Sequence, residues 1–431
     1  MLLKTLPEWL NYLEKSHPVA IDFGLDRIRH VAKNLGFLVD KNQIDNSSRK
    51  NNNKYRYAFL LQRTKVVIVG GTNGKGTCVS ILDSILREAG YNTGCYTSPH
   101  LIRFNERITI NGRCASDEDI CAAFEEINTA RDLVGLSYFE FSTLAALIIM
   151  AKSDLDIIIL EVGLGGRLDA VNFVDPHLSI ITGIALDHEQ WLGDNLDFIG
   201  KEKAAIARPN KPLLYGDTKP VNGVIEVAND MNAKILINGK DFFYDDFNVI
   251  KSYCLPRASM TCAMKAAKIL DPNINLRLIN EGLNKTKIDG RFHRIKFNGI
   301  NFILDVAHNP QAAKMLSERI QDLNLRDKVQ IITGIMSDKD IPGILSPFIN
   351  LTNKWNFCNI PNNVRASSTT FLTKILNKLK KRKGDYSISE YSSVGDALDI
   401  TVQNNKPGDT IVIFGSFFIV GAALTWFNEA H

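Results

Sequence analysis

Short apolar runs alternate with amphipathic segments along most of this chain. The apolar run KVVIVGG, residues 65–71, precedes CVSILDSILREAG, residues 78–90, in which apolar positions recur at helical spacing and a glycine ends the pattern. LDIIILEVG, residues 155–163, and LSIITGIALDHEQ, residues 178–190, repeat the strand-like runs. Strand-length runs separated by helices are typical of βαβ units, so we predict an α/β fold with a mostly parallel sheet.

A second alternating series begins near residue 300 with INFILDVAH and continues to TIVIFGS at residues 410–416. The chain has 431 residues, which is longer than one hydrophobic core usually supports. We therefore predict an N-terminal domain over residues 1–285, a linker over residues 286–294, and a smaller α/β domain over residues 295–431. The polar run at residues 40–56 is expected to be an exposed loop.

The glycine-rich segment GTNGKGT, residues 71–77, joins the first apolar run to the following helix. It departs from the strict G-x-x-x-x-G-K-[ST] pattern, because Val69 stands where glycine is required and Gly76 follows Lys75. Consecutive glycines let backbone N–H groups face an anion, and Lys75 adds a positive charge. Thr77 offers a hydroxyl to a magnesium ion. The position between strand and helix favours a phosphate site over a simple tight turn.

Polar side chains follow two further apolar runs. Glu161 comes directly after IIIL, and Asp187 and His188 follow the run at residues 178–186. Ligands gather at the carboxyl ends of strands in open α/β sheets, so a metal-linked carboxylate is expected at this edge. An ordinary ion pair of Glu161 with a neighbouring arginine is the alternative. The loop TSPHLIRFNERI, residues 97–108, is rich in polar groups and suits an active-site rim.

Bulk composition narrows the class of partner. The 51 basic and 47 acidic residues give a net charge of only +4, which argues against nucleic acid or a membrane surface. Seven scattered cysteines form neither a disulfide framework nor a zinc pattern, and they suit a reducing compartment. The start of the chain does not resemble a secretory signal, and no run approaches the length of a membrane span. We expect a cytoplasmic, monomeric protein that binds small molecules.

Taken together, the motifs resemble the folylpolyglutamate synthase and dihydrofolate synthase family of the Mur ligase superfamily. That family's loop has the form G-T-N-G-K-G-[ST], which accounts for the departure from the strict pattern. The resemblance implies a P-loop Mur-ligase-like ATPase domain followed by a Rossmann-like domain. It rests on an ordered set of segments over nearly the whole chain: GTNGKGT, TSPHLIRFNERI, FEFSTLAAL, EVGLGGRLDAVN, LDHEQWLG, IGKEKAAIA, LDVAHNP and GIMSDKD.

The resemblance also implies roles at matching positions, with ATP and two Mg²⁺ sites as cofactors. Catalytic roles fall to Lys75, His308 and Lys203, the last as a carbamylated lysine that helps position a second metal. Metal ligation falls to Ser98, Glu161, His188 and Lys203. ATP binding falls to Gly71, Thr72, Asn73, Gly74, Lys75, Gly76, Thr77, Ser259, Arg291 and Asp305, with Arg291 and Asp305 on the second domain.

Substrate positions follow in the same way. Pterin contacts are implied at Asp22, Phe139, Glu140 and Phe141, for which core packing is the alternative, and at Leu168, Asp169 and Ala170. The glutamate side is implied at His308 and Ser416. Two positions depart from the family. Ser259 stands in LPRASMT where the family often has asparagine that touches nucleotide, and Asp289 replaces the usual proline. The shorter Ser259 side chain is expected to make a weaker nucleotide contact.

The implied reaction is ATP-dependent addition of L-glutamate to dihydropteroate and to reduced folates through an acyl phosphate. A synthase that acts on folates only is the near alternative. A UDP-muropeptide ligase is disfavoured because only some 70 residues precede the loop. A P-loop switch or nucleotide-dependent binding protein is the alternative from another class, but it does not need the DVAHNP and GIMSDKD segments of the second domain.

Overall fold

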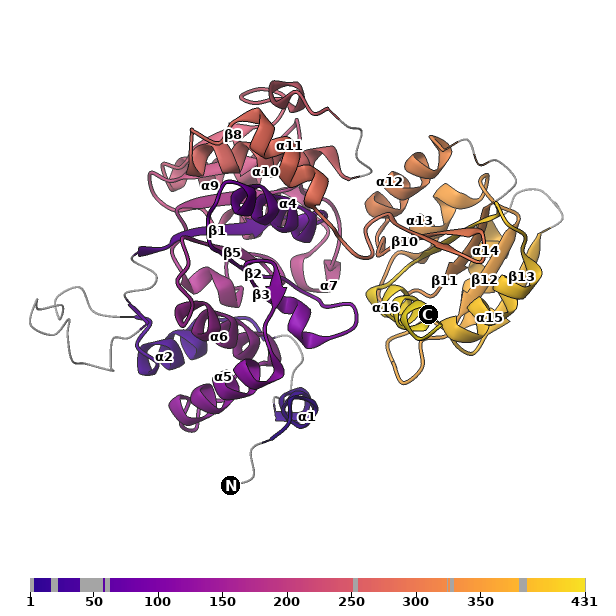
Figure 1. The fold of residues 1–431 in the computed structure, drawn as a ribbon, viewed down its shortest axis with the longest axis horizontal. Helices are drawn as coiled ribbons and strands as arrows, with labels where there is room; N and C mark the ends of the chain where they lie inside the picture. Colours follow the sequence, from indigo (N-terminus) through magenta and orange to yellow (C-terminus); the bar gives the residue numbers. More distant parts are fainter. Residues whose placement is uncertain are drawn as a thin grey trace, which may run out of the picture. The chain divides into compact units, whose positions relative to one another are not determined.

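The computed structural model describes residues 4–16, 22–38, 57–58, 63–250, 255–323, 325, 329–379 and 386–430. The chain divides into two compact units (Figure 1). One comprises most of the chain up to Thr286, and the other comprises Lys287–His431 together with Leu101–Arg103. The division falls within the predicted linker segment. The polar run at residues 40–56, predicted as an exposed loop, lies outside the described residues.

The first unit is built on an eight-stranded sheet in the order β4-β3-β2-β5-β1-β6-β7-β8. Six neighbouring strands run parallel, namely β2, β5, β1, β6, β7 and β8, whereas β3 and β4 form an antiparallel extension at the β2 edge. The strands are β1 (Lys65–Gly70), β2 (Thr93–Tyr96), β3 (Ile108–Ile110), β4 (Arg113–Cys114), β5 (Ile157–Glu161), β6 (Leu178–Ile181), β7 (Pro212–Tyr215) and β8 (Lys234–Ile237).

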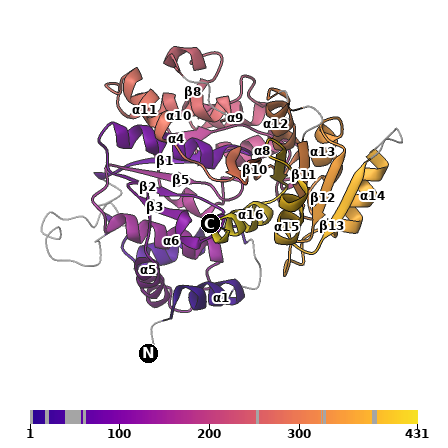
Figure 2. The ribbon, with the colours of Figure 1, turned by 45° about the vertical axis from the view of Figure 1, so that its right-hand side comes forward.

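Helices cover both faces of this sheet. In Figures 1 and 2, α4, α10 and α11 pack together on one face, and α5 and α6 lie on the opposite face. The helices of the unit are α1 (Leu6–Ser16), α2 (Asp26–Asn34), α4 (Lys75–Glu88), α5 (Asp117–Ala130), α6 (Tyr138–Ala151), α7 (Glu189–Leu192), α8 (Leu196–Ala204), α9 (Asn222–Asp230), α10 (Arg257–Leu270) and α11 (Leu276–Lys285).

The second unit holds a six-stranded sheet in the order β13-β12-β11-β14-β10-β9, parallel except for the edge strand β9. Its strands are β9 (His293–Phe297), β10 (Ile300–Asp305), β11 (Val329–Thr333), β12 (Lys354–Cys358), β13 (Ser387–Tyr391) and β14 (Thr410–Phe414). Its helices are α12 (Pro310–Gln321), α13 (Ile341–Leu345), α14 (Thr369–Leu379), α15 (Val394–Asn404) and α16 (Phe417–Glu429).

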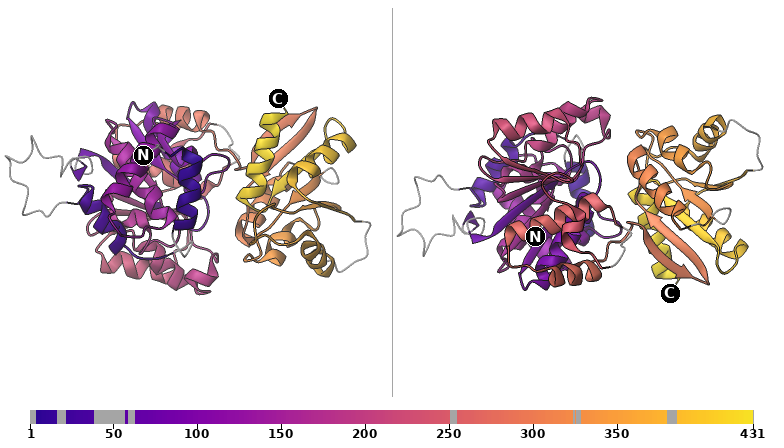
Figure 3. Two further views of the ribbon diagram at one scale, coloured as in Figure 1. Left: turned by 90° about the horizontal axis from the view of Figure 1, so that it is seen from below. Right: turned by 90° about the horizontal axis from the view of Figure 1, so that it is seen from above.

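Two separate apolar clusters show why the strands of the second unit are apolar throughout. Successive residues of a strand point to opposite faces, so Ile331 packs with α12, α13 and α14 while Ile332 packs with α15 and α16. Figure 3 shows helices flanking both sides of this sheet. A parallel sheet covered on both faces requires continuous apolar runs, and the predicted α/β fold is confirmed.

Helix ends explain two details of the pattern. Gly90 has φ of 89° and follows the last turn of α4, as its position in the sequence predicts. The segment at residues 139–141 lies in the first turn of α6. A capping box causes this, because the Ser137 side chain accepts from the backbone of Glu140 and the Glu140 carboxylate accepts from the backbone of Ser137.

Among the residues that the structure describes, no helix is both long enough and apolar enough to cross a bilayer.

Candidate active site

The glycine-rich loop lies between β1 and the N-terminus of α4. Gly71 has φ of 131°, and Gly74 has φ of 80° at the N-cap of α4, so both occupy backbone conformations that favour glycine. A side chain at Gly71 would place Cβ 2.1 Å from Thr182 Oγ1. The loop is tied to β6, because the Thr72 N–H donates to Gly183 O over 2.9 Å. The loop thus brings a helix N-terminus and its backbone amides to one place, which is the geometry of an anion site.

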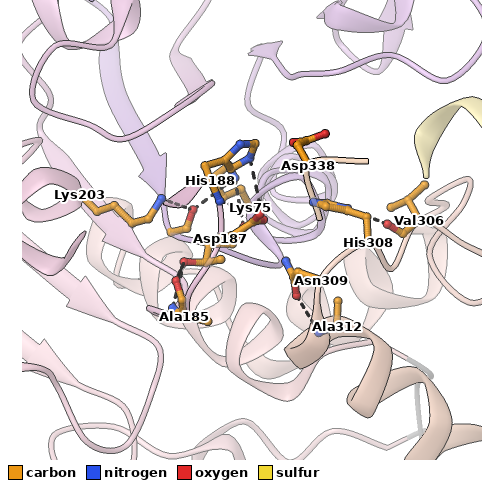
Figure 4. A network of polar contacts seen from close by, with 12 residues as sticks. Lys75, Ala185, Asp187, His188, Lys203, Val306, His308, Asn309, Ala312 and Asp338 are labelled. Atoms are coloured by element: carbon orange, nitrogen blue, oxygen red, sulfur yellow. Dashed lines mark hydrogen bonds and ion pairs between the residues drawn. The ribbon is translucent and has the colours of Figure 1, made fainter. Parts of the chain in front are cut away.

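Lys75 is the first residue of α4 and is partly buried. Its Nζ donates to two carbonyl oxygens of the loop, Gly71 O at 3.2 Å and Thr72 O at 3.4 Å. These contacts hold the ammonium over the loop (Figure 4).

Thr77 is fully buried, and its Oγ1 has no hydrogen-bond partner among the residues that the structure describes. Leaving a buried hydroxyl unsatisfied costs about 1–3 kcal/mol. Such a group in a native fold needs an explanation, and a ligand that supplies the missing partner is the simplest one.

Glu161 ends β5, adjacent to β1, and only 4% of its surface is exposed. Its carboxylate faces the first turn of α4, since a Cβ at Gly76 would lie 3.5 Å from Oε2. The backbone N–H of Ser98 donates to the same Oε2 over 3.1 Å. The structure thus brings Ser98 and Glu161 together beside the loop.

Asp187 and His188 follow β6, the other neighbour of β1. His188 has φ of 55° and begins α7, and its Nε2 lies 3.9 Å from Asp187 Oδ2. The backbone N–H of His188 also donates to Asp187 Oδ1 over 2.8 Å. Figure 4 shows both side chains beside Lys75 and Lys203.

Lys203 on α8 is 5% exposed, and its Nζ donates to Gly71 O over 3.2 Å. Burial and then the charge of Lys75 lower the pKa of Lys203 from 10.5 to about 7. A lysine with this pKa is an uncharged amine in a large fraction of molecules at neutral pH. Since the uncharged amine is the nucleophile that reacts with CO₂, the environment suits the predicted carbamylation.

The predicted pterin residues divide into groups with different surroundings. Phe141 is 1% exposed and packs in the core with Trp9 and Phe124. Phe139 lies against Gly163, where a Cβ would approach its ring to 2.6 Å. Phe141 therefore has the environment of a core residue, which was the alternative for this segment.

Glu140 carries a buried carboxylate with an incomplete set of partners. Its Oε2 accepts from the Ser137 backbone over 2.7 Å, while Oε1 receives no hydrogen bond from any described residue. Arg27 Nε lies 3.3 Å from Oε1, and Arg27 also pairs with Asp22 over 2.7 Å. The sequence prediction missed Arg27, which lies five residues after Asp22 in the same IDFGLDR segment.

Asp169 is 5% exposed and lies between Leu168, which is partly buried, and Ala170, which is buried. Its carboxylate accepts from Leu164 N over 2.9 Å and from Val171 N over 3.0 Å. Burial raises the pKa of Asp169 to about 6, against the lowering effect of these hydrogen bonds. The carboxylate holds the segment in its turn and caps the short 3₁₀ helix Ala170–Phe173.

Ser259 on α10 is 2% exposed, and its hydroxyl donates to Gly74 O over 3.0 Å. A hydroxyl has one proton, so this bond leaves Ser259 only an acceptor to offer a nucleotide. Asp289, the other departure, is exposed and lies 3.3 Å from His293 Nδ1.

In the second unit, Arg291 and His308 both lie against the ring of Phe417, at 5.2 Å and 5.7 Å from its centroid. His308 Nδ1 donates to Val306 O over 2.8 Å, which fixes the ring orientation (Figure 4). Asp305 accepts from the backbone of Phe292 and Ala307, and burial raises its pKa. Ser416 caps α16 by accepting from Ile419 N over 3.2 Å.

A glycine loop between a strand and a helix, with a carboxylate on the adjacent strand and a second α/β unit, is the arrangement expected for the Mur ligase class. Residues 290–417 match the family model for "Mur ligase, glutamate ligase domain". The dihydrofolate synthase/folylpolyglutamate synthase of Escherichia coli K12 is 34% identical over 440 residues, covering 97% of this chain and 96% of that protein. The chain belongs to the dihydrofolate synthase/folylpolyglutamate synthase family.

Solved structures agree with this assignment. E. coli FolC in complex with DHPP and ADP has a TM-score of 0.86 and 31% identity, covering 99% of this chain and 98% of that one. The Yersinia pestis bifunctional enzyme complexed with AMPPNP and Mn ion has a TM-score of 0.85 and 32% identity, with the same coverage. The family recognised from the ordered motifs is therefore confirmed.

Proposed function

We propose that this protein is an ATP-dependent ligase that adds L-glutamate to dihydropteroate and to reduced folates. The observation that carries the proposal is the glycine loop, with Lys75 over its carbonyls, the Glu161 carboxylate facing Gly76, and the buried, unpartnered hydroxyl of Thr77 one residue further on. Family membership over nearly the whole chain supports the substrate class. The predicted cytoplasmic location and monomeric state remain predictions.

The residues at the loop fit a nucleotide with a divalent metal. Mg²⁺ prefers oxygen ligands, and Thr77 Oγ1 and the Glu161 carboxylate supply them at a helix N-terminus suited to phosphates. Ser98 and His188 complete the predicted set, with Lys203 joining it when carbamylated. When bound, the metal neutralises charge on the phosphates. Within the described ranges, no three His, Cys, Asp or Glu side chains form a metal cluster, and this mixed set does not need one.

The proposed reaction has two steps. The acceptor carboxylate attacks the γ-phosphorus of ATP, giving an acyl phosphate and ADP. The amino group of glutamate then attacks the acyl carbon, phosphate leaves, and the amine loses a proton. Lys75 and the loop amides stabilise charge on the transferring group, as in other phosphoryl transfers. The nucleotide role of Arg291 and the catalytic role of His308 stay predictions from the family resemblance.

A paired acceptor assay tests the proposed function. Purified protein is given ATP, Mg²⁺ and glutamate with dihydropteroate, with tetrahydrofolate, or with no acceptor, and ADP and the glutamylated product are measured. We expect product with both acceptors and none when glutamate or acceptor is left out. Product with tetrahydrofolate alone would identify the folate-only synthase. Nucleotide hydrolysis without product from either acceptor would support the switch-protein alternative.

Replacing Thr77 by valine separates a ligand role of its hydroxyl from a structural role. Valine has nearly the same shape but no unsatisfied hydroxyl, so the free energy of unfolding without ligands should stay equal or rise by about 1 kcal/mol. Activity at limiting Mg²⁺ should fall, with a higher Mg²⁺ concentration needed for half-maximal rate. Urea denaturation and Mg²⁺ titration measure the two effects. A loss of unfolding free energy with unchanged Mg²⁺ dependence would mean that the hydroxyl has a structural partner.

A further inference from the structure

A half-exposed tryptophan lies close to the predicted metal edge of the first unit. Trp191 on α7 leaves 44% of its surface exposed, which is unusual for the largest side chain in proteins. Its backbone N–H donates to His188 O over 2.8 Å, so its position is fixed relative to the histidine. Trp191 is not among the predicted site residues.

Phe23 holds the indole ring in place. The two ring centroids are 5.9 Å apart with an interplanar angle of 71°, an edge-to-face arrangement. Such aromatic pairs contribute about 0.5–1.5 kcal/mol beyond the area that they bury. The pair joins segments some 170 residues apart in the sequence and keeps an aromatic surface of Trp191 accessible.

Contacts within this one unit continue from the aromatic pair to a buried carboxylate. Phe23 follows Asp22, whose Oδ2 lies 2.7 Å from Arg27 Nη1. Arg27 in turn pairs with Glu140, whose Oε1 is buried and receives no hydrogen bond from the described residues. These contacts connect the Glu140 carboxylate, which is ion-paired with Arg27, through Asp22, Phe23 and Trp191 to His188.

The acceptor in the proposed function has three chemical parts in the same order. Its pterin offers N–H donors that match a carboxylate, its benzoyl ring is flat and apolar, and its carboxylate must reach the metal edge to react. An aromatic surface between the two polar ends suits the flat ring.

We propose that Trp191 contacts the benzoyl ring of the pteroate acceptor and that Phe23 is its positioning residue. The pair thereby contributes acceptor affinity and distinguishes complete pteroates from pterins that lack the ring. This inference rests on the proposed function, because it takes the acceptor from it.

The test compares Trp191→Ala, Trp191→Phe and Phe23→Ala with Phe198→Ala as the control. Phe198 is 52% exposed on the neighbouring helix α8 and has no role in the site. Trp191→Ala should raise KM for dihydropteroate about tenfold, equivalent to about 1.4 kcal/mol. Its KM values for ATP and glutamate should stay unchanged, and Trp191→Phe should recover part of the loss. Phe23→Ala should raise the same KM by a smaller factor.

Tryptophan fluorescence gives a readout independent of turnover. Dihydropteroate should quench the tryptophan fluorescence of the wild-type protein, and most of that quenching should be absent in Trp191→Phe. Trp9 and Trp355 are 1% exposed, and Trp426 lies on α16 of the second unit with its indole N–H donated to Asp399. A 6-hydroxymethylpterin probe, which lacks the benzoyl ring, should bind wild type and Trp191→Ala with equal affinity.

The possible outcomes separate this inference from the proposed function. Unchanged KM for dihydropteroate in Trp191→Ala, with an active wild type, would overturn the aromatic contact and leave the ligase intact. Equal losses for dihydropteroate and for the pterin probe would also overturn it, because the ring would not be the group recognised. A wild type that binds dihydropteroate with Trp191-dependent quenching but forms no product would overturn the ligase and retain the contact.

Discussion

Replacing Lys75 by alanine should lower kcat for glutamate addition by about 10³-fold, with little effect on folding. The Lys75 ammonium lies over the glycine loop, 3.2 Å from Gly71 O and 3.4 Å from Thr72 O, with no carboxylate among these contacts. A positive charge held in this way is available to a phosphoryl group as charge develops on it. Alanine keeps the helix start of α4 and removes the ammonium together with its two hydrogen bonds to the loop.

Single-turnover rates and circular dichroism measure the two parts of this prediction. Lys152→Ala is the matched control, because Lys152 also ends in an ammonium but forms an exposed pair with Glu126 on α5. We expect the control to retain wild-type kcat, since exposed pairs contribute little. If Lys75→Ala retained wild-type turnover, Lys75 would have no part in the phosphate site.

Replacing Lys203 by alanine should lower kcat by about 10²-fold to 10³-fold, because the modified side chain is proposed to carry an essential negative charge. Lys203 is buried beside Gly71 O and close to the charge of Lys75. Small carboxylates such as acetate or formate should restore part of the activity, since the space vacated by the side chain can admit them. Incubation of wild type with ¹³C-bicarbonate should give a carbamate resonance that is absent in Lys203→Ala.

Lys201→Ala serves as the control for this substitution. Lys201 is two residues earlier on α8, but its side chain is 49% exposed and pairs with Glu226. The control should keep both the activity and the carbamate resonance. Lys203→Ala with full activity, or rescue of Lys201→Ala by acetate, would contradict the proposed modification.

The same lysine gives a pH dependence of stability in bicarbonate-free buffer. Its pKa is lowered from 10.5 in the unfolded chain to about 7 in the folded one, so between these values the unfolded state binds the extra proton. The free energy of unfolding therefore rises with pH across that range, and the cost of burying the ammonium is complete below about pH 7. Lys203→Met should be more stable than wild type at pH 6, and the difference should shrink by pH 10.

The two departures from the family pattern show what local sequence can and cannot predict. Serine at position 259 predicts a shorter reach, and this follows from its chemistry alone. Ser259 donates its single proton to Gly74 O because α10 packs against α4. The two residues are some 185 positions apart in the chain. A nucleotide contact from this hydroxyl as donor is therefore less favourable than the sequence suggests.

The pterin segment illustrates the same difference. The aromatic residues of FEFS could belong to a site or to the core, and their spacing does not decide between these. The capping box at Ser137 starts α6 ahead of these residues, and the first turn directs Phe141 into the core and leaves Glu140 beside Arg27. Trp191 was not predicted as a site residue, because its partner Phe23 is distant in sequence and only folding brings the two rings together.

The sequence by itself determined the alternation of strands and helices, the glycine loop, the polar residues at the strand ends and, through its ordered motifs, the family. These properties depend on local periodicity and on residue type, and both can be read from neighbouring positions in the chain. The tertiary structure decided the lowered pKa of Lys203, the unpartnered hydroxyl of Thr77 and the aromatic pair at Trp191. Those properties depend on desolvation and on contacts between distant segments, which exist only once the sheet and its helices have packed.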